Sequence, residues 1–366
     1  MAGKALLVLE DGTVFQGKSF GAASTSFGEV VFNTSMTGYQ EMLTDPSYAG
    51  QILMPTYPLI GNYGINDEDF ESAKVQVSGF VVREHCELPS HWQSTRTLHQ
   101  FLESQGIPAI SGIDTRALTR RLRSRGVMMG VVTSSYGPGE ALEFLKRQPA
   151  YGDVDLVQQV TAPEAYDWDG APAGGDRPTR WDVTLIDLGL KYNVARILHA
   201  KGCRVTVVPA RTSPEEVLAA APDGVVLSPG PGDPALLEYM TATAKGLVGR
   251  VPVMGICLGH QVLAHALGCK TYKLKFGHRG GNHPVKDLAT GRIQITAQNH
   301  GYAVDPDSLP PEVTVSHVNL NDGTVEGIRH RSLPLLSIQY HSEASPGPMD
   351  NVAMFDRFLD MVGEAR

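Results

Sequence analysis

The sequence predicts an α/β protein with a C-terminal doubly wound, mostly parallel sheet and a smaller N-terminal α+β domain. From residue 181 onward, short apolar runs alternate with segments of helical periodicity, the pattern of parallel strands joined by helices. Before residue 160 the pattern is mixed and opens with two β-rich runs. A stretch rich in Pro, Gly and Ala separates these halves. We therefore predict domains at 1–160 and 181–366, joined by a linker at 161–180.

The N-terminal half begins with a predicted β-hairpin, because residues 4–9 and 13–20 flank the turn Glu10-Asp11-Gly12. Residues 28–58 are poor in charge and only weakly periodic. We expect a long irregular stretch there, and such stretches inside compact domains tend to be functional. Further expected elements are a strand at 75–82, a helix at 94–105 entered at Ser94, and a helix with Asp114 as its N-cap.

The helix after Asp114 carries a run of arginines. Such a run is usually a solvated face, and here docking onto an acidic partner is an equally weighted alternative. The residues are Arg116, Arg120, Arg121, Arg123 and Arg125.

The C-terminal half reads as β-α-β-α-β-α-β-α, so a site is expected at the carboxyl ends of its strands. Strands are predicted at 183–187, 203–208, 225–227 and 251–257, with helices at 191–200, after Ser213, and after 257. Strands at 293–297, 313–318, 325–329 and 335–340 follow in quick succession and suggest a partly antiparallel extension, which a helix at 349–362 closes.

The segment Gly255-Ile256-Cys257-Leu258-Gly259 has the spacing of a nucleophile elbow with cysteine in place of serine. A sharp strand-to-helix turn strains its central residue, so the neighbours two positions away must lack a Cβ. The turn sets the sulfur at a helix N-terminus, where partial positive charge favours thiolate. A buried structural cysteine is the alternative, with roughly even odds for the isolated motif.

A cysteine nucleophile needs a base, a group that orients the base, and donors for the oxyanion. A predicted strand ends at His341-Ser342-Glu343, and residues two apart on a strand end can point the same way. Cys257, His341 and Glu343 then form a candidate triad. The Leu258 N–H and an N–H from the turn at Gly230 and Gly232 would meet the oxyanion.

The composition narrows the classes of function. The net charge of −8 and pI near 5.8 argue against nucleic acid as a partner. The four cysteines are far apart, without a C-x-x-C pair, which suits a reducing cytosol rather than a disulfide framework or zinc site. The first apolar run is too short for a signal peptide, and no apolar stretch reaches membrane-spanning length.

Two of these motifs resemble those of the class I, or triad, glutamine amidotransferases. They are the segment Gly255 to Gln261 and the segment His341-x-Glu343. More specifically, both halves resemble the carbamoyl-phosphate synthase small chain family. The segments that carry the resemblance are S-P-G-P-G-D-P at 228–234, K-F-G-H-R-G-G-N-H-P-V at 275–285, T-A-Q-N-H-G-Y at 296–302, F-N-T-S-M-T-G-Y-Q-E at 32–41 and L-T-D-P-S-Y at 43–48.

The resemblance implies hydrolysis of L-glutamine, with Cys257 as nucleophile, His341 as base and Glu343 as its orienter. The ammonia would pass to a large synthetase chain that makes carbamoyl phosphate from bicarbonate. That partner would hold the ATP and the divalent metal, and this chain is expected to carry no cofactor. The implied glutamine contacts are Ser47, Gly230, Gly232, Leu258, Gln261, Asn299, Gly301 and Tyr302. Asp45-Pro46 would fix the backbone so that Ser47 presents its hydroxyl and N–H.

The chain departs from the family pattern at three places. Ser342 stands where the family has proline, Tyr340 where it has glycine, and Pro229 where it has asparagine. Neither Ser342 nor Tyr340 removes a catalytic atom. His278 and His283 are expected to belong to a structural turn rather than a metal site, and His300 to the scaffold.

Two other functions compete with a glutaminase subunit. One is a free-standing cysteine amidase with the same elbow, which would not need an N-terminal domain of this kind. The other is a non-catalytic assembly subunit, which the retention of Cys257 and His341 argues against.

Overall fold

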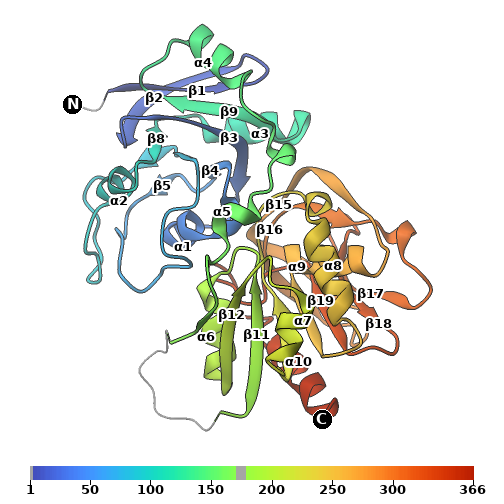
Figure 1. Cartoon of the computed structure of the whole chain (residues 1–366). Coiled ribbons are helices and arrows are strands. Elements are labelled where there is room, and N and C mark those ends of the chain that lie inside the picture. The colour runs from blue at the N-terminus through green and yellow to red at the C-terminus, as the bar shows by residue number, and fades with distance from the viewer. Residues whose placement is uncertain (1–2, 170–178) are drawn as a thin grey trace. The chain divides into compact units, whose positions relative to one another are not determined.

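The computed structural model describes residues 3–169 and 179–366 (Figure 1). The chain divides into two compact units, Met1–Val154 and Asp155–Arg366. Among the described residues, no helix combines the length and the apolar character needed to cross a bilayer. The division falls a few residues before the start of the predicted linker.

The N-terminal unit is built around a closed β-barrel, in the order β1-β2-β8-β6-β4-β3-β9. The predicted hairpin is confirmed, since β1 and β2 pair antiparallel from Lys4↔Lys18 to Val8↔Val14. The barrel strands are β1 (Lys4–Leu9), β2 (Val14–Gly21), β3 (Thr25–Asn33), β4 (Gln51–Pro55), β6 (Gly79–Val81), β8 (Pro108–Ser111) and β9 (Met128–Thr133).

The expectation of an irregular stretch at 28–58 is wrong. The segment contains most of β3, then helix α1 (Tyr39–Thr44), a 3₁₀ turn at Pro46–Tyr48 and strand β4. Its apolar runs are buried on both faces of their strands, so they lack the two-residue alternation that marks a half-buried strand. The weak periodicity therefore came from complete burial.

Two helices of this unit, α2 and α3, begin at capping side chains. Helix α2 (Leu98–Ser104) starts later than expected, because Thr97 and Gln100 form its capping box and Ser94 does not cap it. Helix α3 (Thr115–Arg125) starts as expected, with Asp114 accepting from the Ala117 N–H at 2.9 Å. The remaining elements are β5 (Leu59–Ile60), β7 (Glu84–His85) and α4 (Pro138–Leu145).

The C-terminal unit holds a ten-stranded sheet in the order β10-β12-β11-β13-β14-β19-β18-β17-β15-β16. Strands β12 to β19 of this order pair in parallel, and β18, β17, β15 and β16 continue it antiparallel. The strands are β10 (Tyr166–Asp167), β11 (Trp181–Asp187), β12 (Cys203–Pro209), β13 (Gly224–Leu227), β14 (Val253–Ile256), β15 (Thr271–Asp287), β16 (Ile293–Val304), β17 (Val313–Asn319), β18 (Val325–His330) and β19 (Leu335–Ile338).

Helices cover both faces of the parallel part, which confirms the doubly wound prediction. Val194 of α6 and Phe358 of α10 belong to the core on one face, whereas Val217 of α7, Met240 of α8 and Val262 of α9 belong to the core on the other. The helices are α5 (Val157–Val160), α6 (Tyr192–Ala200), α7 (Pro214–Ala219), α8 (Glu238–Leu247), α9 (Leu258–Ala266) and α10 (Ala353–Glu364).

Two features of this unit differ from the prediction. The long hairpin β15–β16 was not foreseen on its β15 side, where Lys, His and Gly interrupt any apolar pattern. Part of the predicted linker joins the sheet, since Tyr166 and Asp167 of β10 pair with β12. Residues 170–178 of that linker lie outside the described residues.

Candidate active site

Cys257 occupies a sharp turn between strand β14 and helix α9. Its φ of +53° lies in the left-handed region that non-glycine residues rarely adopt. A Cβ on Gly255 would lie 2.6 Å from the Gly259 carbonyl oxygen, and a Cβ on Gly259 would lie 2.3 Å from the Leu227 carbonyl oxygen. Only glycine fits at these two positions, and the turn sets the sulfur at the N-terminus of α9.

His341 lies close to Cys257 because β14 and β19 are parallel neighbours. Ile256 pairs with Ile338, and the Cys257 N–H donates to the Ile338 carbonyl oxygen at 2.9 Å. Three residues further on, the His341 N–H donates to the Ala297 carbonyl oxygen of β16 at 2.9 Å. Cysteine and histidine therefore both lie at the carboxyl ends of neighbouring strands.

The His341 ring is held by a buried carboxylate. Its Nδ1 lies 2.6 Å from Glu343 Oε1, and both side chains are almost fully buried. Lys191 Nζ lies 3.2 Å from the same Oε1 and also donates to the Ala344 carbonyl oxygen. The lysine side chain is only 3% exposed, so the three charged groups interact without screening by bulk water.

The pKa values follow from this grouping. Burial alone would raise the pKa of Glu343, but the Lys191 ammonium, and then His341, lower it to about 2. Burial alone would lower the pKa of His341, but the Glu343 carboxylate and the Cys257 sulfur raise it to about 10. The arrangement thus favours an ionised carboxylate beside an imidazole that readily takes up a proton.

The second ring nitrogen of His341 is available for proton transfer. Its Nε2 is buried and has no hydrogen-bond partner among the described residues. Cys257 raises the pKa of this ring, and its Sγ donates to the Asn299 carbonyl oxygen at a distance of 3.6 Å. Since Nδ1 is engaged by Glu343, Nε2 is the atom left to exchange a proton with the thiol.

The two backbone segments predicted to supply the oxyanion donors adjoin one another. The Leu258 N–H is the first of helix α9, a position that has no carbonyl partner within the helix. Gly230 packs against the same residue, because a Cβ there would lie 2.8 Å from Leu258 Cδ2 and 2.2 Å from the Leu188 carbonyl oxygen. Gly232 lies in the same turn with φ +95°.

Helix α9 and strand β16 bring together most of the residues expected to contact glutamine. Gln261 Nε2 donates to the Tyr302 carbonyl oxygen at 2.8 Å and to Gln339 Oε1 at 3.0 Å. Asn299 accepts from Cys257 through its carbonyl oxygen. Gly301 lies between Asn299 and Tyr302 on β16. These three residues, together with Gln261 of α9, place four of the expected glutamine contacts at one segment of the strand.

Ser47 belongs to the N-terminal unit, in the 3₁₀ turn that follows Asp45. The Asp45 carboxylate accepts its N–H at 2.8 Å, so this N–H is occupied, in contrast to the expectation that it is presented to a ligand. The Ser47 hydroxyl oxygen is buried and unpartnered within the part of the chain that the structure describes. Its role as a glutamine contact stays a prediction.

Lys191 was missed as a functional residue. The sequence predicts Lys191 at the start of a helix, and in the structure it is the N-cap residue of α6. A signal was present: Lys191 is a single cation that closely follows the apolar strand β11, at the edge where the parallel strands end. A lysine at that edge is a candidate partner for a buried carboxylate.

The unusual residues around His341 are fully buried. Tyr340 packs edge-on against the His317 ring with centroids 5.7 Å apart. The Tyr340 hydroxyl and the Ser342 hydroxyl find no hydrogen-bond partner among the residues described. Burial raises the pKa of Tyr340, so this side chain stays neutral and supplies bulk rather than charge.

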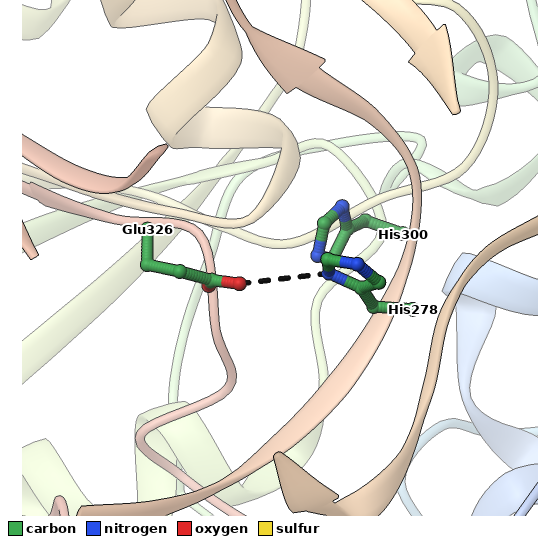
Figure 2. A group of neighbouring side chains, drawn as sticks. All are labelled: His278, His300 and Glu326. Carbon is green, nitrogen blue, oxygen red and sulfur yellow. Dashed lines mark ion pairs between the residues drawn. The ribbon is translucent and has the colours of Figure 1, made fainter. Parts of the chain in front are cut away.

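One group of side chains could hold a metal ion. Ligand atoms of His278, His300 and Glu326 all lie within 4.8 Å of one another (Figure 2). Each histidine is already engaged: His278 Nε2 contacts Asp322 at 2.8 Å, and both His300 nitrogens have acceptors. Burial lowers the pKa of His278, but Glu326 and Asp322 outweigh it and raise the pKa, which disfavours coordination by this ring.

Both halves of the chain match models of known protein families. Residues 7–132 match the family model "Carbamoyl-phosphate synthase small chain, CPSase domain", and residues 184–361 match "Glutamine amidotransferase class-I". The chain is 53% identical to a carbamoyl phosphate synthase small chain of Akkermansia muciniphila, over 99% of this chain and 98% of that protein. It is 52% identical to the small chain of Syntrophotalea carbinolica, over 99% of both.

Similarity extends to plants. The chain is 48% identical to the chloroplastic carbamoyl phosphate synthase small chain of Oryza sativa, over 99% of this chain and 83% of that protein.

Proposed function

The chain belongs to the carbamoyl-phosphate synthase small chain family, with a class I glutamine amidotransferase domain, and on that premise we propose how it hydrolyses L-glutamine. Cys257 is the nucleophile, His341 the base and Glu343 the residue that orients the base. The observation that carries this proposal is the 2.6 Å contact of His341 Nδ1 with Glu343, beside a cysteine held at φ +53°. Such strain is characteristic of functional sites.

In the first step, Cys257 Sγ attacks the side-chain amide carbon of glutamine. His341 Nε2 accepts the thiol proton and then delivers it to the departing nitrogen, which leaves as ammonia. A glutamyl thioester on Cys257 remains. The Leu258 and Gly230 N–H groups stabilise the oxyanion, and one such donor typically contributes about 3 kcal/mol to the transition state.

In the second step, water attacks the thioester carbon. His341 Nε2 takes a proton from the water and returns a proton to the sulfur, so glutamate leaves and the thiol is restored. Glu343 stabilises the imidazolium in both steps. Lys191 keeps Glu343 ionised, and thereby keeps the Nδ1–H of the ring turned toward the carboxylate.

The ammonia then passes to a large synthetase chain that makes carbamoyl phosphate from bicarbonate and ATP. Support comes from the N-terminal unit, because residues 7–132 match the CPSase domain of the carbamoyl-phosphate synthase small chain. Glutamine, this large chain and the metal and ATP bound by the large chain complete the reaction. Ser47 is proposed to contact the amino-acid end of glutamine.

The test measures glutamate release from glutamine by the purified chain, alone and with a large synthetase chain added. We expect release to rise when the partner is present and to be lost in Cys257→Ser. Acid quenching with labelled glutamine should leave label on the wild-type chain only. Undiminished release by Cys257→Ser would refute the assignment of the nucleophile.

A further inference from the structure

Behind the strand segment that holds Asn299 and Tyr302 lies a buried row of polar side chains. Gln298 and His300 come from β16 and Glu326 from β18, and all three are at most 5% exposed. None of them belongs to the triad or to the expected glutamine contacts. Buried polar groups are costly unless their partners are satisfied, so the row has to be explained.

The row ends at the glutamine site. His300 Nδ1 lies 2.8 Å from the Tyr302 carbonyl oxygen, the same oxygen that accepts from Gln261 Nε2. On its other side, His300 Nε2 lies 3.0 Å from Gln298 Oε1. The ring thus spans from Gln298 to the carbonyl that fixes the Gln261 amide.

The row begins at Glu326. Gln298 Nε2 donates to Glu326 Oε2 at 2.9 Å and to Thr296 Oγ1 at 3.0 Å. Asn319 Nδ2 donates to Glu326 Oε1 at 2.8 Å. In Figure 2, Glu326 also faces the His278 ring, with 3.6 Å between Oε1 and Nδ1.

Hydrogen-bond counting shows why a carboxyl group stands at this end. His300 faces an acceptor on each side, and a neutral ring has one N–H. Turning the Gln298 amide over would give His300 a donor, but would set Gln298 Oε1 against Glu326. In either orientation the row is one proton short of satisfying every contact, and a carboxyl group is a side chain that can supply one.

We propose that Glu326 and Gln298 are positioning residues for glutamine binding, acting through His300 on the Tyr302 carbonyl and Gln261. This inference rests on the proposed glutaminase function. Neither residue touches the reacting atoms. Breaking the row frees the His300 ring, and with it the segment that binds glutamine, while the triad stays intact. Such a loss weakens substrate and transition-state binding alike, so it changes KM rather than kcat.

The row also predicts which substitution is tolerated. With Glu326→Gln, the new amide donates to Gln298 Oε1, Gln298 Nε2 donates to His300 Nε2, and His300 Nδ1–H donates to the Tyr302 carbonyl. The ring is then neutral and the row needs no additional proton, provided that the Thr296 hydroxyl turns from the His283 carbonyl oxygen to donate to Gln298 Oε1. Glu326→Leu and Gln298→Met keep a similar volume but cannot make these bonds.

The test is steady-state glutaminase kinetics on the full chain, with the melting temperature of each variant. We expect Glu326→Leu and Gln298→Met to raise KM for glutamine about tenfold with kcat within about threefold of wild type. Glu326→Gln should stay within about threefold of wild type in both constants. Asp287→Leu is the matched control, because Asp287 is a buried carboxylate of the same unit, paired with Arg357 outside the row.

Each outcome of these kinetic measurements supports or overturns the positioning role of Glu326 and Gln298. An unchanged KM in folded Glu326→Leu and Gln298→Met overturns the inference, as does an equal rise in KM for Asp287→Leu. If Glu326→Leu fails to fold, Gln298→Met gives the answer. Inactivity of the wild-type chain, alone and with a large chain, would instead count against the proposed function, so the two failures are distinguishable.

Discussion

The buried Lys191–Glu343 pair allows a double-mutant cycle whose outcome follows from the geometry. Removing one partner of a buried ion pair leaves the other charge uncompensated, which typically costs about 3–5 kcal/mol. Glu343→Gln removes the carboxylate that neutralises the Lys191 ammonium, which is only 3% exposed and also donates to the Ala344 carbonyl oxygen. Lys191→Met leaves Glu343 with His341, which can carry the compensating proton. We therefore expect Glu343→Gln to be the more destabilising of the two changes.

The double variant should lose less than the sum of the single losses, by about 1–3 kcal/mol, because both buried charges are gone. The assay is thermal unfolding followed by tryptophan fluorescence. Trp168 and Trp181 lie in the C-terminal unit, and Trp92 is 86% exposed, so the signal reports on the unit that holds the pair. A loss of 4 kcal/mol corresponds to a drop of about 8–16 °C for a domain of this size.

Unfolding at low pH gives a second measurement, and the direction in which Lys191→Met shifts its midpoint can be predicted. The pKa of Glu343 is lowered to about 2, so its contribution to stability is present above its unfolded value of 4.5 and is lost as pH falls toward 2. Lys191 is the largest favourable charge on this carboxyl, so Lys191→Met should move acid unfolding to higher pH. Strictly additive single losses, with an unchanged acid midpoint, would refute the reasoning.

Three further predictions concern single residues. Ser47→Ala should raise KM for glutamine by a factor equivalent to about 1–2 kcal/mol with kcat unchanged, since one hydrogen bond to a charged group is lost; an unchanged KM would remove Ser47 from the site. Tyr340→Phe deletes a buried hydroxyl that has no partner in the described part of the chain, so the melting temperature should rise or stay constant, and a clear fall in a thermal scan would contradict this. Gly259→Ala would place a Cβ against the Leu227 carbonyl, so glutamate release should be lost, whereas wild-type activity would show that the turn tolerates a side chain.

The sequence predicted those features that depend on local chemistry. The close approach at Gly255 and Gly259 follows from two glycines flanking Cys257, and helix α3 follows from Asp114 as its cap. The parallel order of the C-terminal sheet follows from alternating apolar and periodic segments.

What the sequence did not predict depends on contacts between distant segments. The roles of Lys191 and Glu326 rest on partners about 150 and 30 residues away in the chain, Glu343 and Gln298, and no local pattern marks such pairs. Strand β15 was missed because it alternates irregularly and pairs through two register shifts with β16. Complete burial hid β3 and β4, since a strand buried on both faces has no period of two.

The measurement that tests the central claim most directly compares two nitrogen donors in the complex with a large synthetase chain. Carbamoyl phosphate formation is measured with glutamine and with ammonia, for the wild-type chain and for Cys257→Ser. In the proposed function the thiol is needed only to release ammonia, so the variant should lose synthesis from glutamine and keep synthesis from ammonia. Equal loss with both donors would contradict the account, because Cys257 would then support the fold or the interface instead of attacking glutamine.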